Sequence, residues 1–580
     1  MHPLRRASCL LLFVASGVLA DPGSDFNALL ADAWEWRLAE SPVLASRLGD
    51  RRYNREWPDR SLDAYARRRT QQQDFLSRLR AIDSSQLSAA EQLNYDLFRR
   101  ELQDDLDSYP YRDYLMPINQ RGGVQSLEST AEGLRLQTAA DFEDWLARMA
   151  KVPRYIAQTM ELQEEGRRSG YMPPKILMQR IPAQIAQQLQ EDPEASPFFA
   201  AFRNLPDSLT AEEQARIRQQ ARQTIEQAIV PAYRELYRYF ENHYLPAARD
   251  SIGASELPNG KAFYEYRARS FTTTSMTPDE IHRLGLNEVK RIRGEMQLII
   301  DELEFAGSFA EFLSFLRTDP RFYYETAEEL FDAYLAVSKR IDPELVKLFG
   351  RLPRMPYGLR PIPDNIAPDT TTAYYSPPAA DGSRAGYYYV NLYKPEVRPK
   401  YEIEVLSVHE AVPGHHLQIA LQMELGDMPA FRRYSGFTAF TEGWGLYSES
   451  LGYELGLYKD PYSRFGALTY EMWRAVRLVV DTGIHYKGWS RQQAIDFFKD
   501  NAAKTELDII NEIDRYIAWP GQALAYKIGQ LKILELRSRA EQRLGERFDI
   551  RAFHETLLGG GALPLDLLET RIDRWLADQQ

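Results

Sequence analysis

The chain has 580 residues, of which 27% are charged and 44% are hydrophobic, and its formal net charge is −12. An acidic chain of this kind has no basic surface for a phosphate backbone, so we expect no nucleic-acid partner. Cys9 is the only cysteine, which excludes a scaffold held together by disulfides. The length is sufficient for about two to four domains or for one large helical domain.

The N-terminal residues have the pattern of a signal peptide. Two arginines precede an apolar run over residues 10–19, and Ala20 ends a stretch of small residues suited to cleavage before Asp21. The apolar run is too short to cross a bilayer comfortably. We therefore predict removal of residues 1–20, a periplasmic or secreted protein, and no integral membrane segment after cleavage.

The mature chain is predicted to be mainly α-helical. Capping boxes recur along it, in which an N-cap hydroxyl and an acid or amide three residues later satisfy each other's backbone amides. After the box at Thr326, the apolar residues Leu330, Ala333, Tyr334 and Val337 follow at spacings typical of the buried face of a helix. The boxes are Ser88 with Glu91, Thr210 with Glu213, Thr277 with Glu280, Thr326 with Glu329, and Ser490 with Gln493.

Residues 351–400 differ from the rest of the chain. They contain nine prolines, which exclude a long helix. Within them GYYYVNLY, residues 386–393, is rich in aromatic and β-branched residues and is flanked by helix breakers, which predicts a strand of a small β-sheet. The helical pattern resumes near Tyr401, so this strand should lie beside the helix that follows. We divide the mature chain near residue 270, into an N-terminal helical region (21–270) and a C-terminal region (271–580).

That helix carries VHEAVPGHHLQ, residues 408–418. The helix of a zinc hydrolase often has H-E-x-x-H, with two histidines four apart on one face and a glutamate beside the first. Here Pro413 stands four residues after His409, and the next histidines are His415 and His416. On an unbroken helix, His415, six residues after His409, would point about 120° away around the axis. His416, seven residues after His409, would lie about 10.5 Å away along the axis. Neither histidine could then share an ion with His409.

The intervening Pro413 and Gly414 remove this obstacle. Proline lacks the amide that continues a helix, and glycine adopts backbone angles that other residues avoid. A helix that bulges at these residues would bring a later histidine back beside His409. Bulges of this kind occur often at functional sites.

Two further segments supply acids for a metal site. Glu410 directly follows His409, where a zinc hydrolase carries its general base. The downstream segment FTEGWGLYSES contains Glu442, a candidate third ligand, and Glu449 lies two helical turns further on the same face. Glu449 is suited to orient a ligand histidine, although a surface acid is an equal interpretation.

HEAVPGHHLQ followed by TEGWGLY resembles the bacterial DUF885 family, whose pattern is close to H-E-x-x-P-G-H-x-x-Q. YRARSFTTTSMTPDEI, GYYYVNL, VVDTGIHYKGWS and RYIAWPGQALAYKIG are similar to other stretches of that family, so the resemblance covers nearly the whole mature chain. The family is in turn similar to zincin metallopeptidases of the angiotensin-converting-enzyme and oligopeptidase type, the gluzincins. The resemblance implies a zincin-like helical fold with two lobes around a cleft, in which residues 271–580 carry the metal site. Both regions could also form one DUF885 domain.

Position by position, the resemblance makes His409 and His415 the first two ligands of a Zn²⁺ ion and Glu442 the third. It makes Glu410 the general base and leaves His416 as a neighbour. Three protein ligands leave one position of the ion open for water, as in catalytic zinc sites.

The resemblance also suggests which group stabilises the oxyanion. In peptidases of that type a downstream tyrosine or histidine donates to the substrate oxygen. Tyr516 is the first candidate because an Arg-Tyr pair stands at the corresponding stage there, and Tyr526 and His485 are alternatives. Each could equally be a packed side chain.

Substrate contacts are predicted at two places. An exposed edge of the strand with Tyr388 and Asn391 could pair with an extended peptide, although a buried strand is also possible. Arg474 and Arg477, three apart on one helix face, could hold a substrate carboxylate, although pairing with nearby acids is the simpler explanation.

The sequence therefore predicts an exported zinc metallopeptidase acting on oligopeptides. One alternative is a zinc amidase, which would use the same metal site to hydrolyse a non-peptide or cell-wall-derived amide. Another is a metal- or peptide-binding protein without turnover, and the presence of Glu410 argues against it, because metal binding alone does not need that residue.

Overall fold

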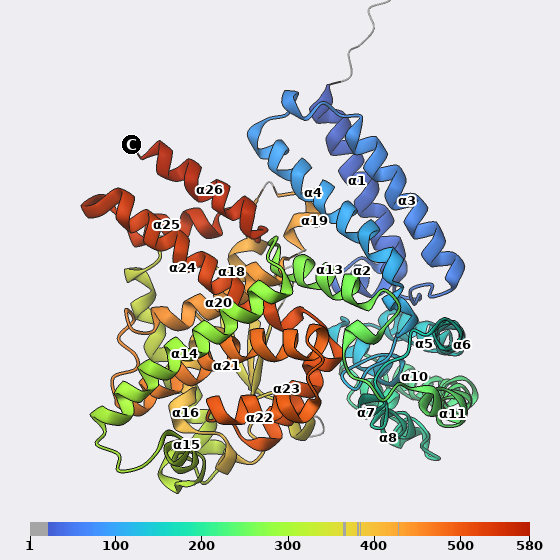
Figure 1. Cartoon of the computed structure of the whole chain (residues 1–580). Helices are drawn as coiled ribbons and strands as arrows, with labels where there is room; N and C mark the ends of the chain where they lie inside the picture. The colour runs from blue at the N-terminus through green and yellow to red at the C-terminus, as the bar shows by residue number, and fades with distance from the viewer. Residues whose placement is uncertain are drawn as a thin grey trace, which may run out of the picture.

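The computed structural model describes residues 21–363, 367–379, 382, 384–426, 428–434 and 436–579. The predicted signal peptide, residues 1–20, lies outside these residues. The described chain is mainly helical with a small three-stranded sheet, which confirms the coarse fold prediction (Figure 1). None of the described helices is both long enough and apolar enough to cross a membrane.

The N-terminal helices pack against one another as a small bundle (blue in Figure 1). Phe26, Leu76 and Leu97 are among the apolar side chains buried there. The helices of this bundle are α1 (Pro22–Glu40), α2 (Pro42–Arg47), α3 (Leu62–Arg80) and α4 (Ala89–Ser108).

The next part of the chain consists of shorter helices joined by turns. Its last helix contacts α20, α21 and α24 of the C-terminal part, so the two predicted regions are in close contact. The division near residue 270 stays a prediction. These helices are α5 (Ala139–Met149), α6 (Val152–Ser169), α7 (Lys175–Met178), α8 (Ile181–Ala186), α9 (Ala200–Arg203), α10 (Ala211–Thr224), α11 (Val230–Tyr239), α12 (Leu245–Ala247) and α13 (Gly260–Thr272).

The C-terminal part is built around two close helix pairs. Helix α14 packs along α21, and α20 packs along α24. In the second pair two glycines face each other, because a Cβ on Gly443 would lie 2.5 Å from the Cα of Gly529. The helices are α14 (Pro278–Glu302), α15 (Phe309–Thr318), α16 (Ala327–Ile341), α17 (Ile403–Glu410), α18 (His415–Met423), α19 (Ala430–Arg433), α20 (Thr438–Leu451), α21 (Pro461–Tyr486), α22 (Arg491–Asn501), α23 (Glu506–Ala518), α24 (Ala525–Leu544), α25 (Ile550–Leu558) and α26 (Leu565–Asp578).

All five predicted capping boxes are present and begin α4, α10, α14, α16 and α22. The structure adds two boxes that we did not predict, at Thr138 with Asp141 and at Ser308 with Glu311. Local pairs of this kind fix where a helix begins, which is why they can be found from sequence.

The sheet has the order β1-β3-β2. Its strands are β1 (Tyr357–Pro361), β2 (Ala373–Ser376) and β3 (Gly386–Val390), the last of which was predicted. β3 pairs with β1 in parallel and with β2 antiparallel. The predicted exposed edge on residues 386–393 is therefore wrong: β3 is the central strand and both of its edges are already paired. The free edges of the sheet belong to β1 and β2.

Candidate metal centre

The histidine-rich segment forms two helices joined by a sharp turn rather than one bulged helix. Helix α17 ends and α18 begins on either side of residues 411–414. The Gly414 amide donates to the Val408 carbonyl at 2.9 Å. A Cβ on Gly414 would lie only 1.9 Å from the carbonyl oxygen of His409, so only glycine fits there. The expected distortion is thus a complete break, which lets α18 start beside the end of α17.

Helix α20 holds this turn in place. The indole nitrogen of Trp444 donates to the Pro413 carbonyl at 2.8 Å, and the Trp444 side chain is fully buried. Glu442 lies on the same helix, two residues earlier. The helix that supplies the acid is therefore fixed to the turn that positions the histidines.

The structure brings the three predicted ligands together. The Nε2 atoms of His409 and His415 lie 3.7 and 3.4 Å from Oε2 of Glu442. One donor atom from each residue lies within 4.8 Å of the other two. The two imidazole rings stand nearly perpendicular, with centroids 4.7 Å apart. Three donors at these separations surround a single point.

Glu449 fixes the orientation of His409. Its Oε1 lies 2.8 Å from Nδ1 of His409 and 3.3 Å from a guanidinium nitrogen of Arg474. All three side chains are almost fully buried. Because Nδ1 is engaged by the carboxylate, Nε2 is left to face Glu442.

The charges of the site favour a cation between the donors. Burial opposes a charged imidazole, but the carboxylates of Glu442 and Glu449 raise the pKa of His409 to about 9. Burial likewise opposes the charge of Glu442, yet His409 and His415 hold the pKa of its carboxyl well below the usual value. The carboxylates therefore attract positive charge to this point.

Gly445 leaves space for the His409 ring. A Cβ at position 445 would lie 2.8 Å from Cε1 of that ring and 3.0 Å from its Nε2. Gly445 is three residues after Glu442 on α20, so it faces the same side of the helix. A glycine at this position therefore lets α20 approach α17 closely enough for the two ligands to meet.

Glu410 stands beside the donors without a fixed partner. It is the last residue of α17, directly after His409, and its side chain is half-buried. Within the described part of the chain, no side chain or backbone group forms a hydrogen bond or ion pair with its carboxylate. A half-buried carboxylate that is free to accept a proton is suited to general-base chemistry.

These residues fit a zinc ion. Two imidazole nitrogens and one carboxylate oxygen are a donor set typical of catalytic zinc sites. The Glu449 carboxylate on the outer nitrogen of a ligand histidine is the usual support for such a set. His409, His415 and Glu442 are therefore the residues that could hold the ion.

Of the three candidates for oxyanion stabilisation, Tyr516 is fully engaged elsewhere. Its hydroxyl accepts from Trp473 at 3.0 Å and from Arg477 at 2.9 Å, and it donates to Glu512 at 2.8 Å. The side chain is 1% exposed. A hydroxyl held by three partners in the interior is not available to a substrate.

Tyr526 is the candidate whose helix packs against the ligand helix α20. It lies in the first turn of α24, and α24 packs on α20 through the contact between Gly443 and Gly529. Its side chain is only partly buried. Burial and then the nearby charge of Glu442 raise the pKa of Tyr526, so the phenol stays protonated and able to donate.

His485 and Asn391 have structural partners. His485 accepts from the Ala254 amide at 3.0 Å and donates to the Tyr516 carbonyl at 2.9 Å, and burial lowers its pKa to about 3. The side-chain amide of Asn391 donates to carbonyls of residues 367–371. Both side chains are buried, and the structure does not bring them to the metal donors.

Tyr388 is buried within the sheet rather than in an open position. Its side chain is fully buried and packs edge-on against Tyr334. Burial first, then Tyr334 and the charge of Glu410, raise the pKa of Tyr388 well above its ordinary value. Tyr388 is therefore a packed side chain of the central strand.

The two predicted arginines are paired with acids. Arg474 contacts Glu449, as described above, and a guanidinium nitrogen of Arg477 lies 3.0 Å from Glu512. Each is less than 5% exposed. The structure therefore supports the simpler of the two explanations from sequence, that both arginines pair with nearby acids.

Sequence reasoning missed Gly445 and Glu512. The signal for Gly445 was present, because T-E-G-W-G places a glycine three residues after the ligand acid on the same helix face. Glu512 stands three residues before Arg515 on α23, a local pairing signal, whereas its other partner, Arg477 of α21, meets it only in the folded chain.

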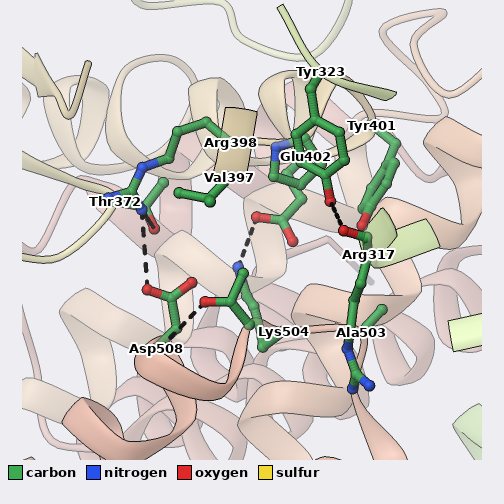
Figure 2. Close-up of a pocket in the computed structure, with 12 residues that line it drawn as sticks. Arg317, Tyr323, Thr372, Val397, Arg398, Tyr401, Glu402, Ala503, Lys504 and Asp508 are labelled. Carbon is green, nitrogen blue, oxygen red and sulfur yellow. Dashed lines mark hydrogen bonds and ion pairs between the residues drawn. The ribbon is translucent and has the colours of Figure 1, made fainter. Parts of the chain in front are cut away.

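Two cavities differ in what they can hold. The smaller, of about 10 Å³, is bounded by a buried ion pair between Lys504 and Glu402, 2.6 Å apart, and by Arg398 (Figure 2). It has room for one water molecule. The larger, of about 1340 Å³, lies between the N-terminal helices and the ends of α13, α20 and α26. It is lined by Thr438, which precedes Glu442 by one turn of α20.

Comparison with known proteins assigns the family. A family model described as "Bacterial protein of unknown function (DUF885)" matches residues 42–572. The chain belongs to the DUF885 family. No curated protein matches this DUF885 chain.

Two solved structures resemble the DUF885 chain over nearly its whole length. One is "the putative lipoprotein from Colwellia psychrerythraea", with 29% identity and a TM-score of 0.90, covering 97% of this chain and 100% of that one. The other is "a putative lipoprotein of unknown function from Shewanella oneidensis", with 19% identity and a TM-score of 0.71, covering 95% and 99%. The second likeness concerns the fold alone.

Proposed function

We propose that this DUF885 protein is an exported zinc metallopeptidase that hydrolyses peptide bonds of oligopeptides. The observation that carries the proposal is the convergence of His409, His415 and Glu442 on one point, with the unpaired Glu410 beside them. A helical body with a short sheet next to the ligand helices is consistent with a zincin-like fold around a substrate cleft.

Each residue of the centre has a separate role in this proposal. A bound Zn²⁺ ion supplies a Lewis acid that polarises the scissile carbonyl and lowers the pKa of the attacking water. Glu410 takes a proton from that water and passes it to the departing amine. Glu449, held by Arg474, keeps His409 in the ligating orientation.

Tyr526 donates to the substrate oxygen as charge develops on it. A donor that is already in position stabilises the developing charge strongly, because nothing has to rearrange during the reaction. Its incomplete burial and the packing of α24 on the ligand helix α20 support this role. The proposal therefore replaces Tyr516, the first choice from sequence, by Tyr526.

The larger cavity offers room for an extended substrate. Its volume of about 1340 Å³ exceeds that of a small-molecule pocket. Thr438 on its wall lies four residues before Glu442, and hence on the same face of α20. An oligopeptide entering there would approach the ligand helix from its N-terminal end.

Export is supported by two observations. The sequence of residues 1–20 has the pattern of a signal peptide. The Colwellia psychrerythraea protein that resembles the chain is described as a putative lipoprotein, which is consistent with export. The site of action would then be the periplasm or the exterior of the cell.

The test is zinc analysis combined with a peptide library. We expect about one equivalent of zinc in the purified mature protein, cleavage of peptides detected by mass spectrometry, and no cleavage by Glu410→Gln with zinc retained. Zinc binding without cleavage of any peptide would contradict peptidase activity. Turnover of non-peptide amides would then indicate the amidase, and its absence a binding protein.

A further inference from the structure

A group of buried arginines next to Tyr526 carries more positive than negative charge. Arg477 and Arg515 share one carboxylate, since nitrogens of both lie 3.0 Å from Oε2 of Glu512. The two cations and the acid are each less than 10% exposed. Burial opposes the charge of Glu512, but Arg515 and Arg477 keep its pKa far below the ordinary value. One positive charge is therefore left over in the interior.

Arg121 adds a second excess charge from a distant part of the chain. It lies in a tight turn in which the backbones of Asn119 and Gly122 bond to each other. The neighbouring Gln120 donates to the Asp514 carbonyl of α23 at 3.1 Å, which fastens the turn to that helix. The Arg121 guanidinium carbon lies 5.5 Å from the ring centroid of Trp519, just beyond α23. The arginine is thus held against the helix that carries Arg515.

Arg121 has no acid to neutralise it. Among the described residues no carboxylate forms an ion pair with it, and its side chain is exposed. Asp514, the acid of the same helix turn, is already paired with Arg180 and Arg491. Desolvation and then the charge of Arg515 lower the pKa of Arg121, while Glu512 and Tyr526 raise it.

Arg477 offers a second sign that an anion is missing. One of its terminal nitrogens is buried and has no hydrogen-bond acceptor in the described part of the chain. A buried donor left without an acceptor is costly, so such groups generally meet a ligand or water. The guanidinium carbon of Arg477 lies 4.2 Å from the centroid of the Tyr526 ring.

This positive group lies next to Tyr526, on the helix that packs against the ligand helix α20. The Arg477 guanidinium packs against the Tyr526 ring, and Gly529, three residues further along α24, meets Gly443 beside Glu442. A peptide whose scissile carbonyl is met by Tyr526 would place its following residues toward the arginines. Guanidinium groups bind carboxylates through paired, charge-assisted hydrogen bonds.

We propose that Arg121, supported by Arg477 and Arg515, binds the C-terminal carboxylate of the substrate. The proposed peptidase is then selective for short peptides with a free C-terminus and cleaves close to that end. This inference rests on the proposed function, and it adds the substrate class and a specificity-determining residue supplied by the N-terminal part of the chain.

The test compares three fluorescent pentapeptides of one sequence. The first ends in a free carboxylate, the second in an amide, and the third in an amide preceded by glutamate, which moves the carboxylate to a side chain. We measure kcat/KM with the zinc-loaded enzyme, and equilibrium binding to the zinc-loaded Glu410→Gln variant. The same measurements are made with Arg121→Gln and with Arg234→Gln, an exposed arginine of α11 as matched control.

We expect the free-acid peptide to be preferred over the amide about 10- to 100-fold, the range for a charge-assisted hydrogen bond. Arg121→Gln should remove most of this preference in KM and in binding, with kcat, zinc content and amide cleavage nearly unchanged, and Arg234→Gln should change nothing. Equal affinity for acid and amide, or an equal loss for both in Arg121→Gln, would overturn the inference. A preference for the glutamyl amide would show that Arg121 does not select the terminal carboxylate, and would overturn the inference.

These outcomes are separable from those of the proposed function. If no peptide is cleaved, the binding measurement still decides whether Arg121 recognises a carboxylate. If peptides are cleaved without regard to the C-terminus, the peptidase stands and the role of Arg121 falls.

Discussion

Gly445→Ala tests whether the shape of α20 sets the metal affinity. The new methyl group would lie 2.8 Å from Cε1 of His409, whereas ordinary contacts begin near 3.4 Å, so the ring must move by about 0.6 Å. The ring has little freedom, because Glu449 holds its other nitrogen at 2.8 Å and the side chain is 2% exposed. Metal sites tolerate ligand displacements of only about 0.2 Å.

We therefore expect Gly445→Ala to weaken zinc binding about 10- to 100-fold, the effect of disturbing the support of a ligand histidine. The assay is a chelator competition titration of the purified protein, with circular dichroism to establish that it is folded. Gly294→Ala in α14 is the matched control, because its Cβ would meet nothing within 4 Å. This control should keep its zinc affinity and gain up to about 1 kcal/mol of stability from helix propensity. An unchanged zinc affinity in Gly445→Ala would refute the reasoning.

Three further predictions concern the surroundings of the site. Tyr526→Phe should lower kcat about 100-fold with zinc retained, whereas Tyr516→Phe should mainly cost about 1–3 kcal/mol of stability by leaving buried donors unpaired; a larger kcat loss in Tyr516→Phe would contradict the assignment. Gly529→Ala should destabilise the protein by about 1–3 kcal/mol in chemical denaturation, because its Cβ would lie 1.9 Å from the Ala439 carbonyl; wild-type stability would show that α20 and α24 are not this close. Burial raises the pKa of Asp481 to about 7, above its unfolded value near 4, so the group lowers stability as pH rises between these values. Asp481→Asn should therefore gain stability relative to wild type by about 1.4 kcal/mol per pH unit between pH 5 and 7, and a constant difference would disprove the shift.

The features found from sequence are those encoded over a few residues. The capping boxes, such as Thr277 with Glu280, fix helix starts through contacts within one turn. The Ser308 box has the same S-x-x-E form and was visible too. The pair Pro413 and Gly414 predicted a bulge in one helix; the structure has a turn between two helices there, and it brings His415 next to His409.

Features that depend on packing between distant segments could not be predicted from sequence. Strands β1 and β2 are short and lie in a proline-rich segment, so their pairing with β3 depends on the folded chain. The choice between Tyr516 and Tyr526 depends on how α24 approaches α20 through Gly443 and Gly529. Arg121 reaches Trp519 from almost 400 residues away in sequence, and no local pattern records such a contact.

The central claim is that three side chains bind one zinc ion. The most direct measurement is anomalous diffraction from crystals of the zinc-loaded protein, recorded on both sides of the zinc absorption edge. We predict one strong anomalous peak about 2.0–2.2 Å from Nε2 of His409, Nε2 of His415 and a carboxylate oxygen of Glu442. A zinc peak held by other residues, or no peak between these three side chains in zinc-loaded crystals, would contradict it.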